Sequence, residues 1–125
     1  MEKVTGIGGV FFKVGDVGKM AAWYQEHLGI HTQDGCADFP WREKERPDEI
    51  GRTVWAMFPT DSTHFGESSS RLMINYRVAN LDRMLEQLRT GGIKVEKVED
   101  HDYGRFAWIM DPEGNRIELW EPREK

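Results

Sequence analysis

The chain has 125 residues, of which 38% are hydrophobic and 31% charged, and its formal net charge is −5. This length fits one domain with its own core, and the composition is too apolar for a disordered chain. Nucleic-acid binding requires clustered Lys and Arg, so the negative charge argues against that class of protein. The single cysteine, Cys36, cannot form an internal disulfide.

The first residues show no signal-peptide pattern, and no apolar run approaches the roughly 18 residues that a membrane helix needs. We therefore expect a soluble, cytoplasmic protein. The charges at residues 42–49 alternate in sign, which is typical of a solvent-exposed loop.

The first half of the chain predicts a strand and then a helix. Residues 7–14 are rich in β-branched and aromatic side chains. Asp16 is a good N-cap, apolar residues recur at helical spacing over 17–28, and Gly29 supplies the stop. Further strands are expected at 31–33, 37–41 and 53–58.

The second half repeats this pattern. Residues 72–78 predict a strand, Asn80 a cap, and apolar residues at helical spacing follow until Gly91. Asp111-Pro112-Glu113-Gly114-Asn115 predicts a tight hairpin turn, because Pro presets a turn and Gly or Asn tolerates positive φ. Further strands are expected at 93–98, 105–110 and 116–120.

The two halves align at one offset, which indicates a tandem duplication. Val14 and Val78 lie 64 positions apart, and the same spacing separates Asp16 from Asn80. We predict an α+β fold with two tandem β-α-β-β-β modules, whose curved mixed sheet lines a cleft. The single domain covers residues 1–125, with module one at about 5–62 and module two at about 70–122.

Several stretches resemble the vicinal oxygen chelate superfamily, which includes glyoxalase I, bleomycin-resistance proteins and extradiol dioxygenases. They are residues 10–16, 75–78 and above all 111–120, where the chain reads Asp-Pro-Glu-Gly-Asn-Arg-Ile-Glu-Leu-Trp. The resemblance covers essentially the whole chain. It implies the duplicated fold and a homodimer, but it does not fix the activity, because one fold hosts several chemistries.

The resemblance also implies four positions at which metal-dependent members place His, Gln or Glu ligands. Carried over, these positions are Gly9, Met73, Glu118, and either Trp55 or Ala56. Glu118 is the only good ligand for a divalent ion among them. We therefore expect no bound metal or other cofactor. His64 lies in the 60–70 stretch, which is expected to be a solvated loop.

Glu118 shares a strand face with Trp120, opposite Ile117 and Leu119, so we expect it on the pocket side. Unpaired carboxylates in apolar pockets tend to be functional. A structural ion pair with Arg77, Arg105 or Arg116 is the alternative, and both stay open. The expected ligand-binding residues are Phe11, Trp55, Met73, Asn75, Tyr103, Arg105, Trp108, Glu118 and Trp120.

This lining suits a flat, partly apolar molecule with a polar or cationic handle. The first functional hypothesis is a metal-independent small-molecule-binding protein of the bleomycin-resistance type. The alternative is a lyase, isomerase or dioxygenase-type enzyme, with an atypical metal site or with Glu118 as general base. A third hypothesis is a structural or regulatory interaction module. The sequence does not identify the ligand, nor whether pockets form within one chain or between chains.

Overall fold

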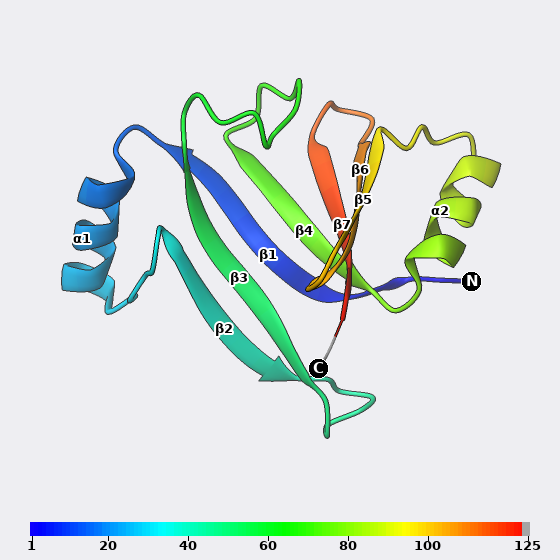
Figure 1. Ribbon diagram of the computed structural model, residues 1–125, viewed down its shortest axis with the longest axis horizontal. Helices are drawn as coiled ribbons and strands as arrows, with labels where there is room; N and C mark the ends of the chain where they lie inside the picture. Colours follow the sequence, from blue (N-terminus) through cyan, green and yellow to red (C-terminus); the bar gives the residue numbers. More distant parts are fainter. Residues whose placement is uncertain (124–125) are drawn as a thin grey trace.

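The computed structural model describes residues 1–123 as a curved sheet with two helices (Figure 1). The elements in chain order are β1 (Val4–Val14), α1 (Val17–Leu28), β2 (Cys36–Arg42), β3 (Ile50–Pro59), β4 (Leu72–Val78), α2 (Leu81–Thr90), β5 (Lys97–His101), β6 (Gly104–Met110) and β7 (Arg116–Pro122). The predicted α+β class is confirmed.

The seven strands form one mixed sheet in the order β2-β3-β1-β4-β7-β6-β5. In each module the first strand pairs in parallel with the last, β1 with β3 and β4 with β7. The remaining pairs are antiparallel, including β1 with β4, which joins the two modules into a continuous sheet. The chain thus builds the expected β-α-β-β-β-like units around a shared centre.

Two strand predictions differ from the structure. Residues 31–33 were expected to form a strand, but Gln33 makes only an isolated bridge to Cys36. The reason is a tight turn, in which Asp34 and Gly35 both take positive φ and the chain reverses at once. In module two, the strand expected from residue 93 begins later, at Lys97.

The helix caps show the duplication in their geometry. Asp16 has φ −140° and ψ 101°, and its side chain accepts a hydrogen bond from the backbone N–H of Lys19. Asn80 has φ −141° and ψ 100° and accepts in the same way from Arg83. Both are N-cap interactions that satisfy an otherwise unpaired helix N–H. The offset of 64 residues therefore holds at atomic detail.

Both helices lie on one face of the sheet, called here the helix face. α2 packs there over a buried cluster formed by Val78, Leu81, Met84, Leu85, Ala107, Ile109 and Leu119. α1 packs less deeply: all twelve of its residues are described and none is buried. Its Tyr24 ring meets Trp55 at 4.8 Å and Phe12 at 6.2 Å.

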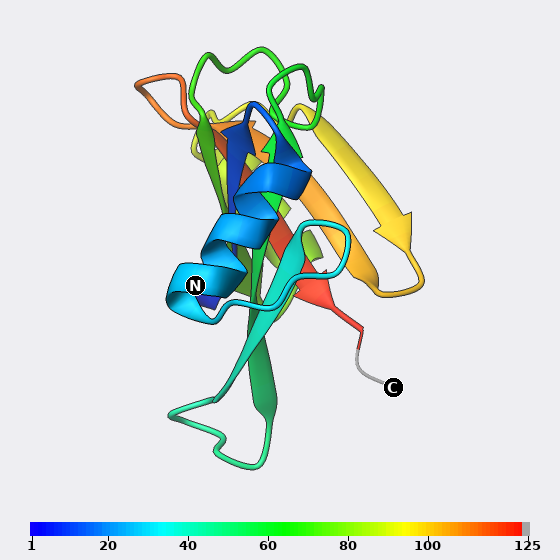
Figure 2. The same ribbon diagram turned by 90° about the vertical axis from the view of Figure 1, so that its left-hand side faces the viewer.

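The opposite face, called here the inner face, carries the alternate side chains of the same strands. The 60–71 loop lies at one end of the sheet, and the 42–49 loop between β2 and β3 lies at the other (Figures 1 and 2). Within residues 1–123, no helix is long and apolar enough to cross a membrane.

Candidate functional site

The 60–71 loop covers one end of the inner face, called here the loop end. Its Phe65 is 0% exposed and belongs to a buried cluster with Phe11, Ala56, Met73 and Trp108. These four side chains come from β1, β3, β4 and β6. The Phe65 ring of the loop therefore packs against side chains from four different strands of the sheet. The expectation of a solvated loop is wrong here, because Phe65 contributes to the core.

Glu118 is buried beneath this loop, with 3% exposure. Asn75 Nδ2 donates a hydrogen bond to its Oε2 at 2.6 Å, and Trp108 Nε1 donates to its Oε1 at 3.0 Å. His64 Nε2 lies 3.0 Å from Oε1. A buried carboxylate is tolerated when its oxygens have such partners. Both oxygens of Glu118 are therefore engaged by the protein itself.

Two of the arginines proposed as partners of Glu118 pair with other carboxylates. Arg105 pairs with Asp82 of α2, and this hydrogen bond raises the pKa of Arg105. Arg116 pairs with Glu96, and its Nη1 donates to the backbone carbonyl of His64. The structural-bridge alternative for Glu118 thus has a partner that the sequence did not suggest, a histidine from the 60–71 loop.

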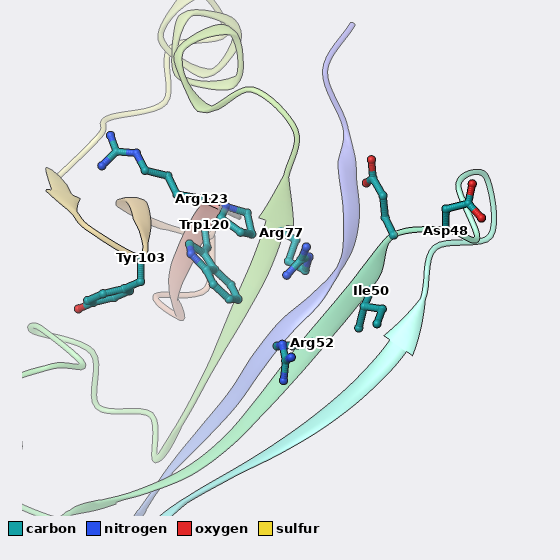
Figure 3. Close-up of a pocket in the computed structure, with 9 residues that line it drawn as sticks. Asp48, Ile50, Arg52, Arg77, Tyr103, Trp120 and Arg123 are labelled. Carbon is teal, nitrogen blue, oxygen red and sulfur yellow. The ribbon is translucent and has the colours of Figure 1, made fainter. Parts of the chain in front are cut away.

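A cavity of about 560 Å³ opens at the other end of the inner face, called here the cavity end (Figure 3). It is lined by β3, β4, β7, the β5–β6 turn and the 42–49 loop. Its residues are Asp48, Glu49, Ile50, Arg52, Arg77, Tyr103, Trp120, Pro122 and Arg123. Tyr103 and Trp120 lie on one side, and Ile50 on the other (Figure 3).

Arg77 forms part of the floor of this cavity and lies between two indole rings. Its guanidinium carbon is 5.4 Å from the Trp41 ring and 5.2 Å from the Trp120 ring. Trp120 in turn stacks on Phe106, with ring centroids 5.9 Å apart and an interplanar angle of 4°. These contacts cross from β2 through β4 and β7 to β6, so the aromatic layer holds Arg77 in place.

Glycines in β1 make this close packing possible. An ideal Cβ at Gly8 would lie 2.9 Å from Trp120 Cε3 and 3.0 Å from Arg77 Cγ. One at Gly6 would lie 2.7 Å from Trp41 Cη2. The side chains of the cavity floor therefore rest directly on the β1 backbone, as glycine in a strand often permits.

The sequence profile of the Glyoxalase/Bleomycin resistance protein/Dioxygenase superfamily matches residues 6–119. The chain belongs to this superfamily. No curated protein matches the chain in sequence.

Solved structures show the same fold at low identity. Methylmalonyl-CoA epimerase from Mycobacterium tuberculosis is 23% identical, covering 97% of this chain and 90% of that one, with a TM-score of 0.58. A variant of the Streptomyces coelicolor epimerase, in complex with 2-nitronate-propionyl-CoA, is 14% identical at a TM-score of 0.69, covering 98% and 100%. A superfamily member from Vibrio splendidus is 12% identical at a TM-score of 0.53, covering 97% and 99%.

The metal-ligand positions of the superfamily do not provide a suitable donor set here. The strand register pairs Asn75 with Glu118 and Phe11 with Ala56, which makes Ala56 the counterpart of Glu118 in module one. Gly9 and Ala56 have no donor, and Met73 offers only a thioether. Within residues 1–123, His, Cys, Asp and Glu do not gather in groups of three or more that could hold a metal ion.

The structure divides the expected ligand-binding residues into three groups. Tyr103 and Trp120 line the cavity. Trp55 and Arg105 lie on the helix face against α1 and α2, so they do not reach the inner face. The remaining five share the loop end beneath or beside the 60–71 loop: Phe11, Met73, Asn75, Trp108 and Glu118.

Sequence reasoning missed Arg77 as a residue of the cavity and Trp41 as a ring that packs against Arg77. Strand alternation places Arg77 on the same face of β4 as Met73 and Asn75. The face toward which the Arg77 side chain points could therefore be predicted from the sequence. Trp41 was harder to place, because the charged 42–49 run obscures the alternation in β2. The close glycines Gly6, Gly8 and Gly9 were a usable signal for bulky side chains lying over β1.

Proposed function

We propose that the protein binds a small, flat, partly apolar molecule at the cavity end of its inner face, without the metal site of the superfamily. The observation that carries this proposal is the cavity of about 560 Å³ lined by Tyr103, Trp120, Ile50 and Arg77. Its size and its mixture of aromatic and polar groups are those of small-molecule sites.

The residues at the cavity end are suited to binding by contact alone. Tyr103 is 62% exposed, and one side of its ring packs on His101 at a centroid distance of 5.2 Å. Ile50, on the opposite side, is 46% exposed. A planar ligand between them would cover apolar surface that now faces water, which favours binding.

An enzyme is the second candidate, and the contact between His64 and Glu118 favours it. An imidazole oriented by a buried carboxylate is a common acid–base arrangement, in which Glu118 or His64 would move a proton. Methylmalonyl-CoA epimerase, one of the structural neighbours, has been solved with methylmalonyl-CoA and NH4+. Replacing His64 by Ala would abolish such an activity and leave binding at the cavity end unchanged.

The homodimer implied by the family resemblance is also part of this proposal. Ile7, Leu72 and Ile74 lie between the two helices on the helix face and are 40%, 55% and 36% exposed. Exposed apolar patches of this kind are typical of protein contacts. Sedimentation equilibrium would measure a dimer mass for the wild-type chain and a smaller mass for Ile74→Lys.

A thermal-shift screen of flat small molecules, followed by titration of the hits, tests the binding function. Tyr103→Ala should weaken a hit by about tenfold, since it removes one aromatic wall. Trp23→Ala is the matched control, because Trp23 is 49% exposed but lies on α1 at the helix face. Equal affinities for the two variants would place the ligand elsewhere and refute the proposal.

A further inference from the structure

The 42–49 loop between β2 and β3 extends beyond the rest of the sheet at the cavity end (Figures 1 and 2). Open space adjoins it elsewhere as well as at the cavity. One hollow of about 310 Å³ lies between the loop and the ends of β4 and β7. Another of about 410 Å³ lies between the loop and the start of β1. The loop therefore has room to move relative to the sheet.

The loop is held together by contacts within itself. The backbone N–H of Glu43 donates to the carbonyl of Glu49 at 3.3 Å, and that of Glu49 donates to the carbonyl of Arg46 at 2.9 Å. The Arg46 side chain pairs with Glu49, and the Arg42 side chain donates to the carbonyl of Pro47. Within residues 1–123, every hydrogen bond and ion pair of residues 43–49 ends inside 42–49. A movement of the loop as a unit would therefore break none of them.

The base of the loop, in contrast, is anchored to the sheet. Trp41 Nε1 donates to Thr53 Oγ1 at 2.8 Å, and that hydroxyl donates to the carbonyl of Ile7 in β1 at 2.6 Å. The Trp41 ring covers Gly51 so closely that an ideal Cβ there would lie 2.3 Å from it. The β2–β3 ladder ends one pair further on, at Ile50. A hinge between the anchored hairpin and the loop would therefore act next to Ile50, since hinges are commonly placed at the ends of elements.

The open mouth of the cavity would leave a bound ligand incompletely covered. Tyr103 and Ile50, the two apolar walls, are 62% and 46% exposed. Small-molecule sites bury roughly 70–90% of a ligand's surface. Asp48 and Glu49 of the loop line the same cavity, and Figure 3 shows Asp48 across the mouth from Tyr103. The loop is thus the segment best placed to cover the ligand.

We propose that the 42–49 loop is a lid that closes over the cavity end when a ligand binds. Closure turns the loop about its base at Ile50 and brings it toward Tyr103. The apolar ligand surface that the loop covers stabilises the closed form over the open one. Loop closure of this kind often determines how fast a ligand is released. This inference rests on the proposed binding function and adds how that site is gated.

The distance between two spin labels measures closure directly. One label is attached to the loop at Lys44→Cys and the other beside Tyr103 at Asp102→Cys, in a chain that also carries Cys36→Ser. Saturation with 2-naphthamide, a flat and uncharged probe, should shorten the mean distance by about 3 Å or more. A control pair, Glu26→Cys on α1 with Asp102→Cys, should keep its distance. An unchanged loop distance with the probe bound, or an equal change in the control pair, would overturn the inference.

Deletion of residues 44–47 tests the consequence for release. The deletion leaves the anchored base and both apolar walls in place, so 2-naphthamide should still bind but dissociate about threefold faster or more in stopped-flow displacement. The matched control replaces Lys44 and Glu45 by Gln, which preserves the length and net charge of the loop, and should release the probe as wild type does. Equal release from the deletion variant and wild type would count against the lid. Failure of 2-naphthamide to bind the wild-type chain would instead refute the proposed function.

Discussion

His64 Nε2 lies 3.0 Å from Oε1 of Glu118, and this contact joins the 60–71 loop to the last strand of the sheet. The imidazole also stacks on Phe58, with centroids 5.1 Å apart and an interplanar angle of 1°. The one family ligand position that retains a carboxylate is therefore used to hold a loop. This arrangement closes the loop end and leaves the cavity end as the accessible part of the inner face.

Glu118→Gln should destabilise the fold by about 1–3 kcal/mol, because one oxygen of a buried, fully engaged carboxylate becomes a donor facing other donors. His64→Ala should cost about 1 kcal/mol, since its side chain is 34% exposed. Urea denaturation measures both. A double-mutant cycle should show coupling of about 0.5 kcal/mol or more. Additive effects of the two substitutions would mean that the contact contributes nothing to stability.

Phe65→Ala should destabilise the protein by about 3 kcal/mol or more, because it empties a fully buried ring site. The 60–71 loop should then become sensitive to limited proteolysis. Phe39→Ala is the matched control: Phe39 is 45% exposed on β2, so its loss should cost about 0.5 kcal/mol or less. Similar losses for the two variants would argue against Phe65 as the anchor of the loop.

Gly8→Ala should disturb the cavity floor, because its new Cβ would crowd Asn75, Trp120 and Arg77. We expect a loss of about 1–3 kcal/mol in stability together with weaker ligand binding. Gly15→Ala provides the control, since an ideal Cβ there has no atom within 4 Å among the described residues. The steric account of the β1 glycines fails if Gly8→Ala is as stable as Gly15→Ala.

The hairpin turn between β6 and β7 should make a pH-dependent contribution to stability. Hydrogen bonds from the Asn115 side chain and backbone lower the pKa of Asp111. The stabilisation is therefore present above the unfolded-state pKa and is lost as the pH falls through the lower folded-state pKa. Asp111→Ala should be less stable than wild type at pH 7, and the difference should shrink at pH 3. A constant difference in urea midpoint between these pH values would contradict this.

Much of the fold could be predicted from local signals. The caps Asp16 and Asn80, the turn at 111–115 and the apolar face of α2 each depend on residues close in sequence. Alternation also placed Met73, Asn75 and Arg77 together on β4, and Glu118 with Trp120 on β7. The same rule separates Arg105 from Trp108, so the expectation that both line the pocket was inconsistent with it.

The rest depends on contacts distant in sequence. The position of the 60–71 loop is determined by Phe65 entering a space between four strands, and no local pattern reports that space. The face of Trp55 was equally uncertain, because the offset between the two modules near β3 is either 63 or 62 residues. The counterpart of Glu118 could therefore be Trp55 or Ala56 until the register with β1 is known. The domain limits, the cytoplasmic location and the absence of a cofactor remain predictions.

Five tryptophans allow the central claim to be tested with one measurement, the indole N–H spectrum of the 15N-labelled protein during titration with 2-naphthamide. Trp41 and Trp120 contact Arg77 at the cavity end, Trp108 reports the loop end, and Trp23 and Trp55 report the helix face. The account predicts that the signals of Trp120 and Trp41 shift with the titration while that of Trp108 stays in place. A shift confined to Trp108, or the absence of any shift at Trp120, would contradict it.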